Sequence, residues 1–154
     1  MTKQTLLQPI TESSDALRVF VYGTLKPGGT YWSDYCEHTV SQIRAAKARG
    51  HLYALPVGYP ALVKAVDGPW ASGYLLQLKH LDHLAAFDKL EGYAADRALE
   101  RNEYYREFCP VYAESGGRLG RAWVYYMTLD RVRSERGILL KEGYWDEALH
   151  IRNF

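Results

Sequence analysis

The sequence contains very little cysteine: Cys36 and Cys109 are the only two among its 154 residues. Two cysteines are too few for the disulfide framework of a small secreted protein. Their spacing matches neither a C-x-x-C redox pair nor a zinc knuckle. A reducing compartment therefore fits best, and we interpret the chain as a cytoplasmic protein.

Long hydrophobic runs are missing as well. Residues 1–15 hold only Leu6, Leu7 and Ile10 as large apolar residues besides Met1, so they lack the continuous apolar stretch of a signal peptide. No later segment approaches the length of a membrane span. A chain of this length accommodates one ordinary domain. We therefore predict a loose N-terminal tail over residues 1–16 and a single domain over residues 17–154.

An excess of one charge sign is also absent, because 19 Lys and Arg residues face 18 Asp and Glu residues, for a net charge of +1. This balance provides no broad positive field for a phosphate backbone, so we expect no nucleic-acid partner and no membrane partner. The 13 tyrosines and 4 tryptophans suit a ligand pocket, a core or a dimer interface equally well, which leaves a homodimer open.

Most of the chain has the pattern of short strands. Apolar and polar residues alternate from Leu17 to Tyr22, and a turn-rich segment follows. Further strands are predicted at residues 43–55 (one long strand, or two bent near Gly50), 61–66, 72–78, 103–113 and 121–128. The total is about six strands with mainly antiparallel neighbours, because the connecting turns are short. We predict an α+β fold, rich in strands, that closes into a small barrel.

Helical periodicity is clearest between His80 and Glu91, where Leu84, Phe87 and Leu90 form an apolar stripe. Gly92 is the expected C-terminal stop of this helix. Two shorter helices are expected, one capped by Thr30 and one within residues 130–136.

The first candidate for chemistry is the loop Tyr22-Gly23-Thr24-Leu25. Turns of this kind end many strands, and the loop lacks the lysine of a phosphate-binding P-loop. Its glycine-rich continuation nevertheless leaves several backbone N–H groups without acceptors. Adjacent N–H groups of this kind bind a carboxylate or an oxyanion.

The second candidate is Glu91. Most glutamates in helices are simply solvated. A carboxylate in the last turn, however, faces the negative end of the helix dipole, which raises its pKa and makes it a better proton acceptor near neutrality. Asp88, one turn earlier, acts in the same direction if both side chains face one pocket.

Other reactive residue types lack the partners that their chemistry requires. The histidine pair has too few further ligands for a metal site, Cys36 has no identifiable base, and the two serines lack the first glycine of a G-x-S-x-G elbow. These residues are His80, Asp82, His83, Cys36, Ser72 and Ser115.

Taken together, the motifs resemble the gamma-glutamylcyclotransferase-like family, in particular its short members akin to gamma-glutamylamine cyclotransferase. The motifs follow the family order from about residue 17 to about residue 145. They are Val19-Phe20-Val21-Tyr22-Gly23-Thr24-Leu25-Lys26, Gly58-Tyr59-Pro60-Ala61-Leu62-Val63, Gly73-Tyr74, Phe87-Asp88-Lys89-Leu90-Glu91-Gly92, Tyr104-x-Arg106, Ala122-Trp123-Val124-Tyr125-Tyr126 and Gly143-Tyr144-Trp145.

The resemblance implies a small mixed barrel flanked by short helices. It also implies cyclisation of a gamma-glutamyl amide or peptide to 5-oxoproline, with release of an amine or amino acid and without a metal or cofactor. In this family the backbone N–H groups of the Tyr22, Gly23, Thr24 and Leu25 loop hold the glutamyl group, and Glu91 transfers protons. The insert Ala94 to Glu103 is expected at the pocket rim, where it affects the choice of substrate.

Two alternatives to a general cyclotransferase stay open. One is a binding or regulatory protein that keeps the fold without turnover, because a fold does not fix a function. The other is a pathway-specific enzyme that removes a gamma-glutamyl protecting group.

Overall fold

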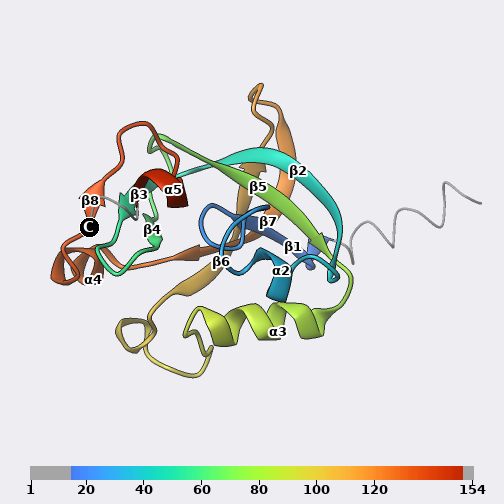
Figure 1. Cartoon of the computed structure of the whole chain (residues 1–154), viewed down its shortest axis with the longest axis horizontal. Coiled ribbons are helices and arrows are strands. Elements are labelled where there is room, and N and C mark those ends of the chain that lie inside the picture. The colour runs from blue at the N-terminus through green and yellow to red at the C-terminus, as the bar shows by residue number, and fades with distance from the viewer. Residues whose placement is uncertain (1–14, 151–154) are drawn as a thin grey trace, which may run out of the picture.

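The computed structural model describes residues 15–150, so the predicted tail lies outside the described residues except for its last two. Strands and short helices alternate irregularly along the chain (Figure 1). In order, the elements are β1 (Arg18–Val21), α2 (Trp32–Tyr35), β2 (Val40–Arg49), β3 (His51–Ala54), β4 (Pro60–Val63), β5 (Trp70–Leu78), α3 (Leu81–Leu90), the 3-10 helix η1 (Leu99–Arg101), β6 (Tyr105–Tyr112), β7 (Arg118–Tyr126), α4 (Leu129–Ser134), β8 (Ile138–Leu139) and α5 (Glu147–His150).

Five strands form a closed barrel in the order β1-β5-β2-β6-β7. Neighbouring strands pair antiparallel, with one exception: β1 pairs with β7 in parallel, Val19 opposite Trp123 and Phe20 opposite Val124. This parallel pair closes the barrel between segments about a hundred residues apart in sequence. The predicted small mixed barrel is confirmed.

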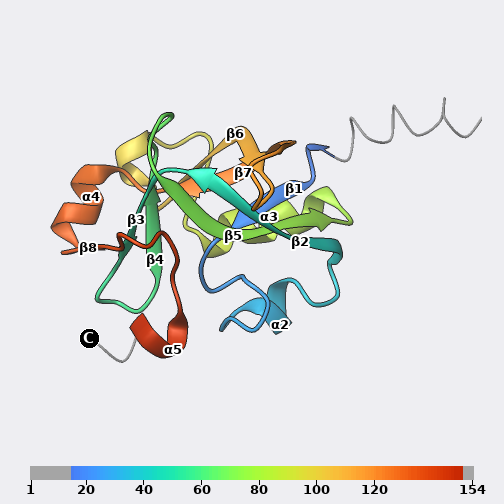
Figure 2. The ribbon, with the colours of Figure 1, turned by 90° about the horizontal axis from the view of Figure 1, so that it is seen from above.

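The remaining three strands form a separate sheet in the order β4-β3-β8. This sheet lies beside the barrel together with α4 (Figure 2). The Leu62 carbonyl of β4 accepts a hydrogen bond from the Met127 amide, just after β7, at 3.0 Å. The described residues form eight strands rather than about six. The predicted alternative of two strands that bend near Gly50 is confirmed by β2 and β3, whereas the two residues of β8 are too few for a periodic pattern.

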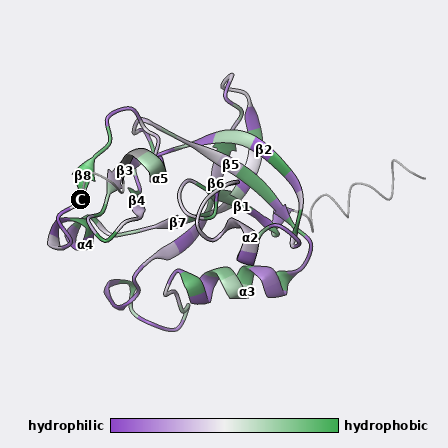
Figure 3. Ribbon diagram, in the orientation of Figure 1, coloured by the Kyte–Doolittle hydropathy of each residue, from purple (hydrophilic) through white to green (hydrophobic). Residues whose placement is uncertain are grey.

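The core consists of two apolar clusters on opposite faces of β1. Phe20 belongs to a cluster that draws buried residues from all five barrel strands, whereas Val19 and Val21 belong to a second one that includes Leu84 and Phe87 of α3. Only one face of α3 packs against the core, and Figure 3 shows the corresponding mixture of hydrophobic and hydrophilic residues along this helix. A Cβ atom on Gly73 of β5 would come within 2.2 Å of the Val21 carbonyl oxygen, so only glycine fits at this crossing.

The end of α3 matches its prediction closely. The helix runs over Leu81–Leu90, Glu91 is its C-terminal cap, and Gly92 follows with φ +68°. A positive φ is the conformation in which glycine ends helices without strain. Glu91 is thereby fixed at the point where the helix stops.

The predicted cap of the first short helix is wrong. Tyr31, not Thr30, precedes α2, and no side chain caps this helix. The side chain of Thr30 instead hydrogen-bonds to Glu147, far away in sequence.

No helix among residues 15–150 combines the length and apolar character needed to cross a membrane.

Candidate active site

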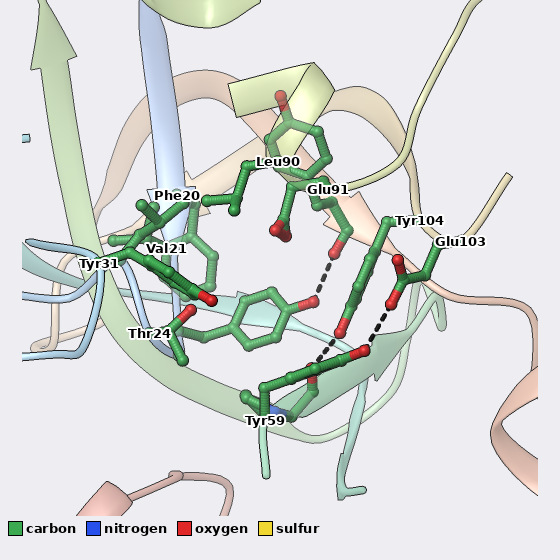
Figure 4. Close-up of a pocket in the computed structure, with 14 residues that line it drawn as sticks. Phe20, Val21, Thr24, Tyr31, Tyr59, Leu90, Glu91, Glu103 and Tyr104 are labelled. Carbon is green, nitrogen blue, oxygen red and sulfur yellow. Dashed lines mark hydrogen bonds between the residues drawn. The ribbon is translucent and has the colours of Figure 1, made fainter. Parts of the chain in front are cut away.

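A cavity of about 240 Å³ opens where the loop after β1 meets the end of α3. Its lining comes from six parts of the chain that the fold brings together (Figure 4). The lining residues are Phe20, Val21, Tyr22, Gly23, Thr24, Leu25, Tyr31, Tyr59, Pro60, Leu90, Glu91, Glu103, Tyr104 and Tyr125. The structure thus places all five sequence-predicted site residues in one pocket.

The loop after β1 lines this cavity and contains backbone donors without protein acceptors in the described part of the chain. It folds through three backbone hydrogen bonds: Lys26 N to Gly23 O at 3.0 Å, Gly29 N to Lys26 O at 2.8 Å, and Tyr31 N to Thr24 O at 2.9 Å. Within the described residues, the amides of Gly23, Thr24 and Leu25 donate to no protein acceptor. Buried N–H groups without partners are rare in proteins. Three in succession beside a pocket indicate a site for an anionic ligand group.

Tyr22 has a structural use for its hydroxyl. The hydroxyl donates to the Tyr125 carbonyl at 2.6 Å and accepts from the Leu62 amide at 3.2 Å. It therefore joins β1 to β7 and to β4 of the second sheet, at the floor of the pocket. Burial raises the pKa of Tyr22 far above its ordinary value, so the phenol stays neutral and keeps both hydrogen bonds.

Glu91 is held at the pocket by its backbone. Its amide donates to Phe87 O at 2.9 Å, and its carbonyl accepts from Tyr104 N at 3.2 Å. Figure 4 shows the carboxyl directed into the space that the lining residues enclose. No side chain among residues 15–150 hydrogen-bonds to this carboxyl, so both of its oxygens are available to a ligand.

The electrostatics around Glu91 favour its neutral form. The residue is partly buried, and burial is the largest cause that raises the pKa of Glu91 to about 8. The negative charges of Glu103 and then Asp88 act in the same direction. The sequence predicted the direction but attributed it to the helix dipole; burial, which depends on the tertiary fold, is the larger cause. A carboxyl with a pKa near neutrality both accepts and returns a proton readily.

Glu103 is a site residue that the sequence did not single out. It ends the 94–103 insert, and its Oε2 accepts a hydrogen bond from the Tyr59 hydroxyl at 2.6 Å. Asn102, only 5% exposed, stabilises the insert by accepting from Ala94 N at 2.9 Å. The insert therefore reaches the pocket, as predicted, and brings a second carboxylate with it.

The rest of the lining is aromatic and apolar. Tyr104 is 4% exposed, and its hydroxyl donates to the Pro60 carbonyl at 2.7 Å. The Tyr59 and Tyr104 rings lie 6.3 Å apart. Among the described residues that line the cavity, none is Lys, Arg or His. The acidic side chains facing a ligand are therefore Glu91 and Glu103, and no cation in the described lining balances their negative charge.

Asp88 does not line the pocket. Its carboxylate accepts from Arg106 at 2.7 Å and 3.1 Å and from the Tyr125 hydroxyl at 2.5 Å. The Arg106 guanidinium also lies 4.2 Å from the centre of the Trp123 ring. This network ties α3 to β6 and β7, so Asp88 holds Glu91 in place through the helix rather than by contact with a ligand.

The other reactive residues lie outside the site. Burial raises the pKa of Cys36 to about 12, which keeps its thiol protonated and unreactive. The histidine pair on α3 lines none of the cavities described here. Within residues 15–150, no cluster of three or more His, Cys, Asp or Glu side chains is suited to hold a metal ion.

Both cysteines are expected to be dispensable for turnover. Cys36 contributes a weak hydrogen bond from its thiol to Leu25 O at 3.6 Å, and Cys109 accepts one from Tyr126 at 3.3 Å. Replacing each by Ser or Ala should leave the turnover rate within about threefold of the original, because neither thiol touches the pocket. Loss of turnover in a variant with a normal melting temperature would contradict this prediction.

Comparison with known proteins agrees with the fold. Residues 19–147 match the family described as gamma-glutamyl cyclotransferase, AIG2-like. A curated protein of Halalkalibacterium halodurans, provisionally named as a gamma-glutamylcyclotransferase, is 44% identical over 48 residues, which are 31% of this chain and 42% of that protein.

Two solved structures share the fold. YkqA from Bacillus subtilis superposes with a TM-score of 0.60 at 19% identity over 88% of this chain, but this chain covers only 42% of YkqA. A solution structure from Arabidopsis thaliana gives a TM-score of 0.55 at 26% identity, with 75% of this chain and 72% of the other covered. The match to the family itself extends from β1 into the first residue of α5. This protein therefore belongs to the gamma-glutamyl cyclotransferase, AIG2-like family.

Proposed function

We propose that this protein converts a gamma-glutamyl amide into 5-oxoproline and releases an amine. The observation that carries the proposal is one pocket in which three backbone amides without acceptors lie across from a carboxyl of raised pKa. The amides suit the α-carboxylate of a glutamyl group. The carboxyl of Glu91 suits proton transfer from the α-ammonium that lies beside it in such a substrate.

The reaction forms one bond and breaks one. The α-nitrogen of the substrate attacks its own side-chain amide carbonyl carbon, and the bond from that carbon to the leaving nitrogen then breaks. Two protons pass from the attacking nitrogen to the leaving nitrogen, and Glu91 carries them as base and then as acid. Because attacker and carbonyl belong to one molecule, the pocket need only fold the substrate and manage protons, a use of proximity that lowers barriers by several kcal/mol.

The charges in the pocket favour an amine as the leaving group over an α-amino acid. A leaving amino acid carries a carboxylate next to its nitrogen, close to Glu91 and Glu103. The described lining offers no cation to pair with it. Like charges in a partly desolvated site cost several kcal/mol. A leaving amine places no such charge there.

Two matched substrates test this choice. Gamma-glutamyl-n-butylamide and gamma-glutamylnorvaline differ only by a carboxylate on the leaving group, and glutathione adds a larger peptide. We expect kcat/KM for 5-oxoproline formation to be at least about tenfold higher for the butylamide, equivalent to 1.4 kcal/mol. A preference for gamma-glutamylnorvaline would contradict the amine assignment. Binding of all three compounds without turnover would contradict the proposed enzymatic activity and would indicate a binding protein instead.

A further inference from the structure

A second cavity lies on the other side of the loop that carries the three amides. It has a volume of about 520 Å³ and is lined by residues 26–29 of the loop and by residues 145–148, which we call the C-terminal segment. Gly23 lines both this cavity and the pocket of Glu91. The loop therefore separates the two cavities, and the C-terminal segment lines the second one.

Hydrogen bonds connect the loop to this segment at two points. The carboxylate of Glu147 accepts from the Thr30 amide at 2.6 Å and from the Thr30 hydroxyl at 2.8 Å, so both of its oxygens are used. The ammonium of Lys26 donates to the Trp145 carbonyl at 2.5 Å. Figure 2 shows α2, which follows the loop, and α5, which contains Glu147, on the same side of the barrel.

The C-terminal segment is itself firmly anchored. The Trp145 side chain is 1% exposed and belongs to the apolar cluster of the barrel. Just before it, the Gly143 carbonyl accepts from Ser72 N of β5 at 2.6 Å. Residues 23–29 of the loop, in contrast, are held by short-range backbone hydrogen bonds, by the Cys36 thiol on the Leu25 carbonyl, and by burial of the Leu25 side chain. The long-range hydrogen bonds from Lys26 and Thr30 add contacts with a segment more than a hundred residues away in sequence.

We propose that Glu147 is a positioning residue, which holds Thr30 and thereby keeps the amides of Gly23, Thr24 and Leu25 directed into the pocket. The predicted effect of Glu147 on turnover rests on the proposed function. The predicted effect of Glu147 on the loop is independent of that function, because it follows from the hydrogen bonds between Thr30 and Glu147. Glu147 lies outside the pocket and touches no reacting group, so it acts on substrate binding and leaves proton transfer by Glu91 unchanged.

The kinetic test compares substitutions at two positions of the same region. Glu147→Ala removes both acceptors and should raise KM about tenfold with kcat within about twofold, because the loop must then be ordered at the expense of binding. Glu147→Gln keeps an oxygen acceptor for the Thr30 amide and should restore KM to within about threefold of wild type. Glu142→Ala is the control, since this exposed side chain lines neither cavity.

Amide hydrogen exchange gives a second readout that needs no substrate. The amides of Lys26, Gly29 and Tyr31, which hydrogen-bond within the loop, should exchange faster in Glu147→Ala than in Glu142→Ala. Thr30→Val removes only the hydroxyl bond and should give a smaller increase in exchange. Faster exchange in Glu147→Ala, together with a wild-type protein that forms no 5-oxoproline, would support the positioning role of Glu147 and contradict the proposed function. Equal KM and equal exchange in Glu147→Ala and Glu142→Ala would overturn the positioning role of Glu147.

Discussion

Replacing Glu91 by Gln should lower kcat by about two to four orders of magnitude, the usual contribution of a positioned acid–base group. The substitution preserves the shape of the side chain and its place at the end of α3, and removes only the group that accepts a proton. Substrate binding should change little, because the loop amides remain. Glu100→Gln, on the exposed insert, is the matched control and should retain full turnover.

The free energy of unfolding of the same variant should increasingly exceed that of the wild type as the pH rises. Folding raises the pKa of Glu91 from its ordinary value to about 8, so the native state binds more protons than the unfolded state across this window. Stability of the wild type therefore falls as the pH rises from about 4.5 to about 8. Glu91→Gln does not titrate and escapes this loss. Its melting temperature should exceed that of wild type at pH 9 and approach it at pH 5.

A loss of turnover without this pH-dependent gain would show that burial does not perturb Glu91. A gain in stability with normal turnover would show a buried carboxyl that has no part in the chemistry. Measuring both properties on one preparation therefore separates the electrostatic environment of Glu91 from its chemical role.

Replacing Thr24 by Pro should raise KM about ten- to a hundredfold, the effect of losing one hydrogen bond to a charged group. Proline lacks the N–H that we assign to the substrate carboxylate, yet it keeps the carbonyl that accepts from Tyr31 N at 2.9 Å. Thr24→Val keeps the N–H and loses only the hydroxyl, so it should stay within about threefold of wild type. Steady-state kinetics with one gamma-glutamyl amide distinguishes the two variants. Equal losses in both would show that the Thr24 side chain, not its amide, binds the substrate.

The sequence was sufficient to predict features determined by local patterns. The stripe of Leu84, Phe87 and Leu90 located α3 to within a residue at each end, and Gly92 marked its stop. These features depend on helical periodicity and on backbone conformation alone. The parallel pairing of β1 with β7 is different, because it joins distant segments and leaves no local signal.

The residues of the candidate site likewise fall into those that the sequence predicts and those that depend on the tertiary fold. The loop at Tyr22–Leu25 and the carboxyl of Glu91 were both predicted, since a strand, a turn and a helix end each have a recognisable pattern. Glu103 was not, because its position depends on the fold of the insert around Asn102 and on its contact with Tyr59. Thr30 was misassigned as a helix cap for a related reason: Glu147, its partner, is 117 residues away.

The most direct test of intramolecular cyclisation is a reaction in ¹⁸O-labelled water. Wild-type protein is incubated with gamma-glutamyl-n-butylamide, and the products are identified by mass spectrometry. Our account predicts butylamine and 5-oxoproline in equal amounts, with no ¹⁸O in the 5-oxoproline, because the ring carbonyl keeps the oxygen of the original amide. Glutamate carrying one ¹⁸O atom would instead show hydrolysis by water and would contradict attack by the substrate's own α-nitrogen.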